Sequence, residues 1–266
     1  MSSLKDSANL VKPALKWAGG KRWLVPTLLE IWKSHSQRRL AEPFVGSMSV
    51  ALGLQPKKAI LNDRNIHLIN FCIWLQKGLY IQLHMQNEQE TYYEFRKRFN
   101  EIALSGKSCT SEAAQLFYYL NRTGYNGLCR FNNKGEFNVP FGRYKVINYI
   151  KDFSAYMPVL SNWEFTSGDF YDMAIEPDDF IYADPPYDVE FTKYGKDDFI
   201  WHDQERLGEW LAKHPGPVVL SNQATERILN LYESLGLSIK ILDAPRRISC
   251  TGDRKSVKEV LAYKNI

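Results

Sequence analysis

Four largely apolar residues run directly into a proline-rich loop in Phe180-Ile181-Tyr182-Ala183-Asp184-Pro185-Pro186-Tyr187. A short apolar run of this kind predicts a buried strand, and the loop then lies at the carboxyl end of that strand, where open α/β sheets bind their ligands. Two consecutive prolines fix the backbone and remove amide donors. The loop is therefore expected to present carbonyl oxygens, the Asp184 carboxylate and the Tyr187 ring.

An acceptor-only loop suits a planar ring that carries an exocyclic amine. The lone pair of such an amine is delocalised, and it becomes nucleophilic only when acceptors bind its hydrogens. The alternative is a tight turn in which Asp184 merely caps a helix. We predict that Asp184, Pro185, Pro186 and Tyr187 carry the chemistry.

Strand and helix patterns alternate on both sides of this stretch, which predicts a mostly parallel α/β sheet. Residues 65–120 instead show successive helical patterns, and 121–144 suggests a hairpin or an ordered loop around Asn132-Asn133-Lys134-Gly135. The predicted architecture is a Rossmann-like, doubly wound sheet built from 1–65 and 150–266, with an α-helical insertion at 66–149 that carries a β-hairpin. The strands are expected at 38–44, 57–62, 163–166, 180–183, 217–221, 237–242 and 257–263.

Composition narrows the class of protein. The chain has 266 residues, 44% of them hydrophobic and 24% charged, which is enough for one sizeable core and an insertion. The sequence contains no uncharged apolar run of the roughly 18 residues that a membrane helix needs, so a cytoplasmic protein is expected. Cys72, Cys109, Cys129 and Cys250 have neither C-x-x-C spacing nor histidine partners, so we expect no disulfide framework and no metal site.

The net charge of +4 conceals two basic segments. Residues 113–145 hold five bases against one acid, and residues 246–258 hold five bases against one acid. Such segments suggest contact with a polyanion, although ordinary solvated surface charge explains either one taken alone.

The first basic segment has the composition of a nucleic-acid reader. Asn121–Arg130 and Phe137–Tyr144 interleave aromatic residues with Arg and Asn on a glycine-rich frame. Arg can fork onto guanine, Asn onto adenine, and an aromatic ring can wedge into a base step. The alternative is a glycine-rich loop that packs its aromatic residues inward.

Two further segments suggest a cofactor site, and a third could be a phosphate loop. Glu42-Pro43-Phe44-Val45-Gly46-Ser47 ends the first predicted strand with a glycine, which lets a cofactor approach the backbone. Asn62-Asp63 places an acid at the next strand end, where it could bind ribose hydroxyls or serve as a cap. Lys16-Trp17-Ala18-Gly19-Gly20-Lys21 lacks the spacing of a phosphate-binding P-loop.

Taken together, these motifs resemble the Dam family of DNA adenine methyltransferases, the N6-adenine-specific D12 class. The resemblance runs from Leu15 to about Tyr263 in the family's order, and Leu120–Lys145 is particularly similar to members that methylate adenine in GATC. It implies that S-adenosylmethionine donates a methyl group to the 6-amino group of an adenine flipped out of duplex DNA. It also implies no metal, no membrane partner, and a cytoplasmic enzyme of the nucleoid or of a phage-infected cell. The sequence leaves the oligomeric state open, and a monomer is favoured.

The resemblance also assigns roles to single residues. The expected cofactor-binding residues are Trp17, Lys21, Phe44, Gly46, Asp63 and Asp184. Lys16 is expected to reach DNA, Tyr125 to intercalate, and Asn126 and Arg143 to clamp phosphates. The expected base readers are Leu128, Arg130, Pro140 and Tyr144, with Arg130 on guanine, and the basic stretch Arg246–Ser249 is expected to contact the DNA backbone.

Two departures from the family's pattern stand out. Met48 replaces the second glycine of F-x-G-x-G, so its side chain either crowds the cofactor or points into the protein. The segment between Tyr187 and Trp201 is shorter than in the family. Two other functions fit the residues: methylation of RNA or of a protein amide, and DNA binding without catalysis if Met48 closes the cofactor site.

Overall fold

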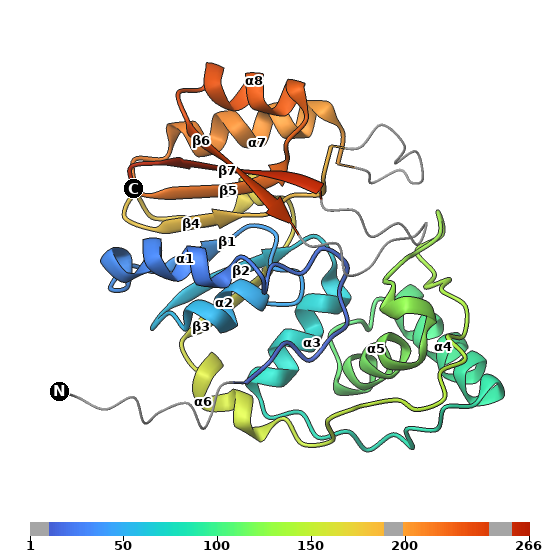
Figure 1. Ribbon diagram of the computed structural model, residues 1–266. Helices are drawn as coiled ribbons and strands as arrows, with labels where there is room; N and C mark the ends of the chain where they lie inside the picture. Colours follow the sequence, from blue (N-terminus) through green and yellow to red (C-terminus); the bar gives the residue numbers. More distant parts are fainter. Residues whose placement is uncertain (1–10, 189–198, 245–256) are drawn as a thin grey trace. The chain divides into compact units, whose positions relative to one another are not determined.

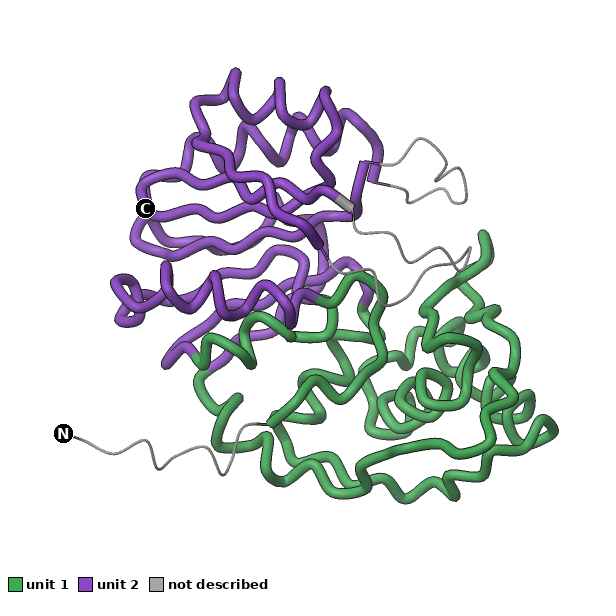
Figure 2. The backbone as a smooth tube through the Cα atoms, in the orientation of Figure 1, with its two compact units in different colours: residues 1–20, 46–55, 66–162 green, residues 21–45, 56–65, 163–266 purple. Residues whose placement is uncertain are grey.

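The computed structural model describes residues 11–188, 199–244 and 257–266 (Figure 1). Contacts divide the chain into two compact units (Figure 2). Unit 1 comprises Met1–Gly20, Gly46–Gln55 and Ile66–Asn162, and unit 2 comprises Lys21–Val45, Pro56–Asn65 and Trp163–Ile266. Within the described ranges, no helix is long and apolar enough to cross a membrane.

Unit 2 is built on a seven-stranded sheet in the order β3-β2-β1-β4-β5-β7-β6, which confirms the predicted doubly wound α/β class. The first five strands are parallel, whereas β7 lies antiparallel between β5 and β6. The strands are β1 (Leu40–Glu42), β2 (Ala59–Asp63), β3 (Trp163–Ser167), β4 (Phe180–Ala183), β5 (Val218–Gln223), β6 (Ser238–Ala244) and β7 (Val257–Lys264).

Strand β4 is buried on both faces, which explains why its sequence is a continuous apolar run. Side chains alternate between the two faces of a strand. Ile181 belongs to the core formed with α7 (Trp201–Lys213) and α8 (Glu226–Ser234), whereas Phe180 packs edge-on against Trp32 of α1 (Val25–Trp32), with ring centres 5.2 Å apart. Helices therefore cover both faces of the sheet at β4.

Unit 1 is mainly helical, with a core of stacked aromatic rings. Phe71 of α3 and Tyr118 of α5 are nearly parallel, with ring centres 5.5 Å apart. His67 of α3 stacks on Phe131 at 5.1 Å, and burial lowers the pKa of His67 to about 4, so this imidazole is neutral at pH 7. The helices of this unit are α2 (Ser49–Leu54), α3 (Ile66–Gln76), α4 (Gln89–Leu104), α5 (Ser111–Thr123) and α6 (Met157–Leu160).

The predicted hairpin is present in unit 1 as two isolated antiparallel bridges rather than as regular strands. The bridges join Phe131 to Phe137 and Gly124 to Phe141. The turn is closed by the Gly135 amide, which donates to the Asn132 carbonyl at 2.9 Å. The short 3-10 segments in the described part of the chain are η2 (Lys33–His35), η3 (Tyr125–Gly127), η4 (Ser154–Tyr156) and η5 (Phe170–Asp172).

Asn100 of α4 ties the hairpin to the helices. Its side-chain oxygen accepts from the Phe137 amide at 2.8 Å, and its side-chain nitrogen donates to the Phe137 carbonyl at 3.2 Å. Tyr92 of α4 adds a hydrogen bond from its buried hydroxyl to the Val139 carbonyl at 2.8 Å. Side chains of α4 therefore hold the returning arm of the hairpin.

We expect Asn100→Leu to lower the free energy of unfolding by about 1 to 3 kcal/mol, because it leaves backbone groups of Phe137 without partners. Urea titration followed by circular dichroism measures this loss. Asn133→Ala, at an exposed turn position, is the control and should change stability by less than about 0.5 kcal/mol. Equal stability of the two variants would contradict the anchoring role of Asn100.

Candidate active site

The Asp184 carboxylate lies at the carboxyl end of β4 and has two donors in unit 2. Its Oδ1 is 3.0 Å from Lys21 Nζ and accepts a hydrogen bond from the Ser221 hydroxyl at 2.8 Å. The Tyr182 hydroxyl lies 2.9 Å from the Ser221 hydroxyl. Because Ser221 uses its only hydrogen on Asp184, Tyr182 donates to Ser221. Burial raises the pKa of Asp184, and Lys21 and Ser221 oppose that shift by stabilising the carboxylate.

Helices α7 and α8 anchor the rest of the loop. Gln204 of α7 donates to the Pro186 carbonyl at 2.8 Å, and Arg227 of α8 forms an ion pair with Asp188. No described residue donates to the Pro185 carbonyl. The loop therefore has a fixed backbone and one carbonyl oxygen available to a ligand beside the Asp184 carboxylate.

Lys21 also lies near a second carboxylate. Its Nζ is 4.0 Å from Glu259 Oε2 on β7 and 4.6 Å from the centre of the Tyr187 ring. Burial raises the pKa of Tyr187, as do the Asp184 and Glu259 carboxylates, so this phenol is neutral at pH 7. Burial also raises the pKa of Glu259, whereas Lys21 lowers it. One buried ammonium thus lies beside two carboxyl groups.

The residues predicted to bind a cofactor are divided between the two units. In unit 2, Asp63 ends β2 and accepts a hydrogen bond from the Asn65 amide at 3.0 Å. Phe44 follows β1, and its half-buried ring lies 5.8 Å from the ring of Phe170 and 5.5 Å from that of Phe199. Lys21 and Asp184 are in contact, as described above.

In unit 1, Trp17 and Gly46 are neighbours. A Cβ atom on Gly46 would lie 3.0 Å from the indole nitrogen of Trp17, and Gly46 has a φ of +48°. Both observations require glycine at this position. Met48 is only 2% exposed, so its side chain is buried. Met48 nevertheless has a φ of +57°, in the left-handed region that favours glycine.

Apart from the stretch Arg246–Ser249, all residues predicted to contact DNA belong to unit 1, and several of them lie in or near η3. Lys16 Nζ donates to the Arg122 carbonyl at 3.1 Å and lies 3.8 Å from the centre of the Tyr144 ring. Burial and the charge of Arg122 lower the pKa of Lys16 to about 8. The Tyr125 amide donates to the Pro140 carbonyl at 2.9 Å, while the Tyr125 side chain is 51% exposed.

Asn126 also lies in η3, whereas Leu128, Arg130 and Arg143 lie along the hairpin. Arg130 is exposed, and its guanidinium donates to the Asn138 side-chain oxygen at 2.7 Å. Asn126 and Arg143 are exposed and have positive φ values of 52° and 50°. Leu128 is half-buried. The predicted contact at Arg246–Ser249 lies outside the described residues, as does most of the segment between Tyr187 and Trp201.

The alternative to a nucleic-acid reader was a loop that packs its aromatic residues inward, and the phenylalanines of this region do pack in that way. Phe137 is 2% exposed, Phe131 stacks on His67, and the Phe141 ring lies 5.5 Å from that of Tyr92. Tyr125 is the aromatic residue of the region that is half exposed. The hairpin thus packs its phenylalanines onto the helices and leaves Tyr125 and Arg130 on the surface.

Four polar residues that support the loop were not predicted from the sequence. Ser221 and Asn222 end an apolar run on β5, Gln204 lies on α7, and Glu259 precedes the buried residues Val260, Leu261 and Ala262. Asn222 Nδ2 lies 3.0 Å from Gln204 Oε1, which orients the Gln204 amide toward Pro186. Polar residues directly beside an apolar run were the available signal in β5 and β7.

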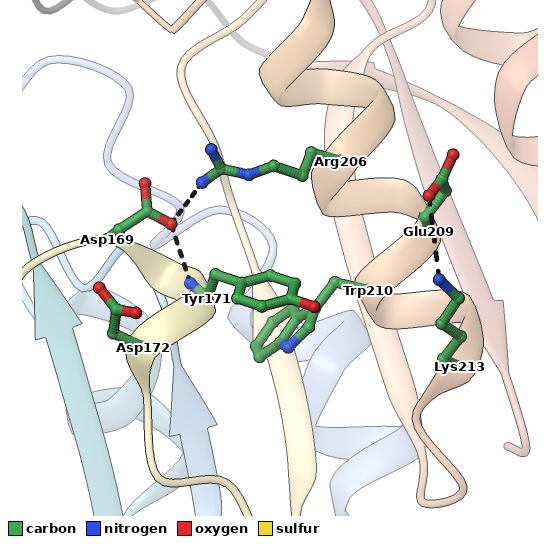
Figure 3. A pocket seen from close by; sticks show the side chains of 7 residues that line it. All are labelled: Asp169, Tyr171, Asp172, Arg206, Glu209, Trp210 and Lys213. Carbon is green, nitrogen blue, oxygen red and sulfur yellow. Dashed lines mark hydrogen bonds and ion pairs between the residues drawn. The ribbon is translucent and has the colours of Figure 1, made fainter.

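A pocket of about 410 Å³ lies between η5 and α7 in unit 2 (Figure 3). Its two cations are paired with acids of the same pocket, Arg206 with Asp169 and Lys213 with Glu209. None of the predicted site residues lines it. A search of the described residues finds no cluster of His, Cys, Asp or Glu that could hold a metal ion.

Comparison with known proteins gives consistent matches. The sequence profile of the D12 class of N6 adenine-specific DNA methyltransferases matches residues 17–248. The chain is 37% identical over 274 residues to the DNA adenine methylase of Escherichia coli strain K12, with 94% of each protein covered. It is 32% identical over 272 residues to the DNA N-6-adenine-methyltransferase of Escherichia phage P1, which covers 96% of this chain but 35% of the phage protein. Type II methyltransferase M.MjaIII of Methanocaldococcus jannaschii is 34% identical over 282 residues, with 92% of this chain and 95% of that protein covered.

We expect Lys21→Met to lower the free energy of unfolding at pH 7 by about 3 to 5 kcal/mol, because it leaves Asp184 and Glu259 buried without their cation. The pKa values of both carboxyl groups are raised by burial. As the pH falls through those pKa values, the groups become neutral and no longer need the ammonium. The difference from the wild type should therefore be smaller at an acidic pH than at pH 7.

Urea unfolding at the two pH values measures this effect. Lys213→Met is the matched control, because it removes an ammonium whose ion pair with Glu209 is exposed. That change should cost less than about 1 kcal/mol at either pH. If the loss of unfolding free energy in Lys21→Met is the same at both pH values, then lost packing rather than lost charge pairing is its cause.

Proposed function

The chain belongs to the D12 class of N6 adenine-specific DNA methyltransferases, and from this membership we propose that it transfers the methyl group of S-adenosylmethionine to the 6-amino group of adenine in GATC sites of duplex DNA. The observation that carries the proposal is the anchored loop after β4. Its Asp184 carboxylate and Pro185 carbonyl offer two acceptors for the two hydrogens of one amine.

The residues of unit 2 fit S-adenosylmethionine. Lys21, Asp184 and Glu259 form a cluster with more carboxylates than cations, which suits a positively charged ligand. The Phe44 ring can stack on an adenine, and the Asp63 carboxylate at the end of β2 can accept ribose hydroxyls. Trp17 and Gly46 of unit 1 complete the proposed set of cofactor-binding residues.

When bound, S-adenosylmethionine supplies a methyl group activated by a sulfonium. The chain's own residues hold the amine: Asp184 and the Pro185 carbonyl accept its hydrogens, and Tyr187 stacks on the base. Lys21 and Ser221 fix the Asp184 carboxylate before the base arrives, so little reorganisation is needed. Asp184 then holds the proton that the methylated amine loses.

The proposed target-recognition region is 66–149 in unit 1, together with Lys16. Flipping the adenine costs a few kcal/mol. We assign the wedge that replaces the base to Tyr125, the phosphate clamp to Asn126 and Arg143, and the base contacts to Leu128, Arg130, Pro140 and Tyr144. The half-exposed ring of Tyr125 and the exposed Arg130 support this assignment.

Asp184→Asn should lower methylation of GATC duplexes by at least about 100-fold, because an amide cannot take up a proton and presents donors to the amine. Transfer of labelled methyl groups to duplex DNA measures turnover, and fluorescence anisotropy measures DNA binding, which should change less than about threefold. RNA and duplexes without GATC are the substrate controls. Equal labelling of RNA, or unchanged turnover in Asp184→Asn, would defeat the proposal.

Arg130→Ala should reduce discrimination at one guanine of the site by about 1 to 3 kcal/mol, because a guanidinium fork on guanine is lost. Rates on the cognate site and on duplexes with a single substitution measure the change. Lys134→Ala, which removes an exposed charge from the hairpin turn, is the control and should leave discrimination unchanged. If Arg130→Ala weakens cognate and random DNA equally, Arg130 contacts a phosphate.

A further inference from the structure

Glu259 is a buried acid on β7. It lies opposite Gln223 of β5 and Leu242 of β6. Its side chain is 11% exposed, and Oε2 has no hydrogen-bond partner among the described residues. A carboxylate in such a place is unfavourable unless a charge compensates it. The Tyr187 hydroxyl lowers the pKa of Glu259 but carries no charge, so the charged partner that the structure provides is Lys21, whose Nζ lies 4.0 Å from Oε2.

Lys21 does not neutralise this region completely. Its ammonium is closer to Asp184, at 3.0 Å, than to Glu259. The hydroxyl groups of Tyr182 and Tyr187 stay neutral, because burial raises their pKa values and the carboxylates raise them further. Glu42, buried at the end of β1, adds a further acid that acts on Tyr182. With both carboxyl groups ionised, the cluster of Lys21, Asp184 and Glu259 carries a net negative charge.

We propose that Glu259 is a charge-selecting residue, whose carboxylate favours the positively charged S-adenosylmethionine over the neutral thioether of the product, S-adenosylhomocysteine. This inference rests on the proposed function, which brings the sulfonium close to an amine held by Asp184. The attraction between opposite charges is several-fold stronger in a water-poor site than in bulk water. The product has lost the sulfonium charge and therefore loses this attraction.

Such selectivity favours the replacement of bound product by a new molecule of the methyl donor. The product retains the adenosyl group and the amino-acid group, so contacts to those groups cannot distinguish it from the methyl donor. A negative charge near the reacting sulfur can distinguish the two. Asp184 carries such a charge but is paired with Lys21 and Ser221. The unbalanced charge is therefore that of Glu259.

Calorimetric titration with S-adenosylmethionine and with S-adenosylhomocysteine, in the absence of DNA, tests the proposal. The wild type should prefer the methyl donor by about tenfold or more. Glu259→Gln keeps the shape of the side chain and removes the charge. It should weaken binding of the methyl donor by about tenfold and change binding of the product by less than about twofold.

Asp243→Asn is the matched control, because it removes the same charge from an exposed position on β6. It should leave the preference unchanged. Glu259→Met is the second variant if circular dichroism shows Glu259→Gln to be unfolded, since Met has a similar volume and no polar atom to satisfy, and Lys21 keeps its ion pair with Asp184. It should lose the preference in the same way.

Four results would overturn the inference. Equal weakening of both ligands in Glu259→Gln would make Glu259 a structural partner of Lys21 only. The same loss in Asp243→Asn would assign the effect to the overall charge of the protein. If the wild type binds both ligands equally, the proposed selectivity is absent and the proposed function is unaffected. If the wild type binds neither ligand, both proposals are wrong.

Discussion

The Lys21 ammonium is the interaction on which the site depends. It lies between Asp184 at the end of β4 and Glu259 on β7, and α1 begins only four residues later. Without this cation, both carboxyl groups would take up protons to avoid a buried, unpaired charge. Asp184 would then be a donor as well as an acceptor. A single lysine thus keeps the loop in the charge state that acceptance of an amine hydrogen requires.

The support of the loop extends well beyond its four residues. Ser221 and Asn222 come from β5, Gln204 from α7, and Tyr232 of α8 lies 2.9 Å from Asn222. These side chains are almost fully buried, and each hydrogen bond fixes the next side chain in the network. The acceptors are therefore set by the packing of the parallel sheet and its helices, so catalysis by positioning follows from the fold itself.

Elements formed by neighbouring residues could be predicted from the sequence, whereas contacts that depend on the order of the strands in the sheet could not. Phe180–Ala183 could be recognised as β4 because a strand buried on both faces is continuously apolar, and Asp184–Tyr187 follow it directly. Glu259 could not be placed beside Lys21, because that proximity depends on β7 entering the sheet antiparallel between β5 and β6. The orientation of Met48 also depended on tertiary packing. The turn residues predicted the hairpin, but they did not predict that Phe137 is buried and Tyr125 is exposed.

The segment Lys16–Lys21 shows why a motif without recognisable phosphate-loop spacing can still be strongly constrained. The main chain of Lys16 is held by Asn121, which accepts from its amide at 2.9 Å and donates to its carbonyl at 2.8 Å. A Cβ atom on Gly127 would lie 2.3 Å from the Cβ of Lys16, so the turn at η3 needs glycine where this segment passes. Lys21, five residues later, belongs to unit 2 and pairs there with Asp184, which follows β4. Each lysine is thus fixed within its own unit, by contacts that a requirement for phosphate binding alone would not explain.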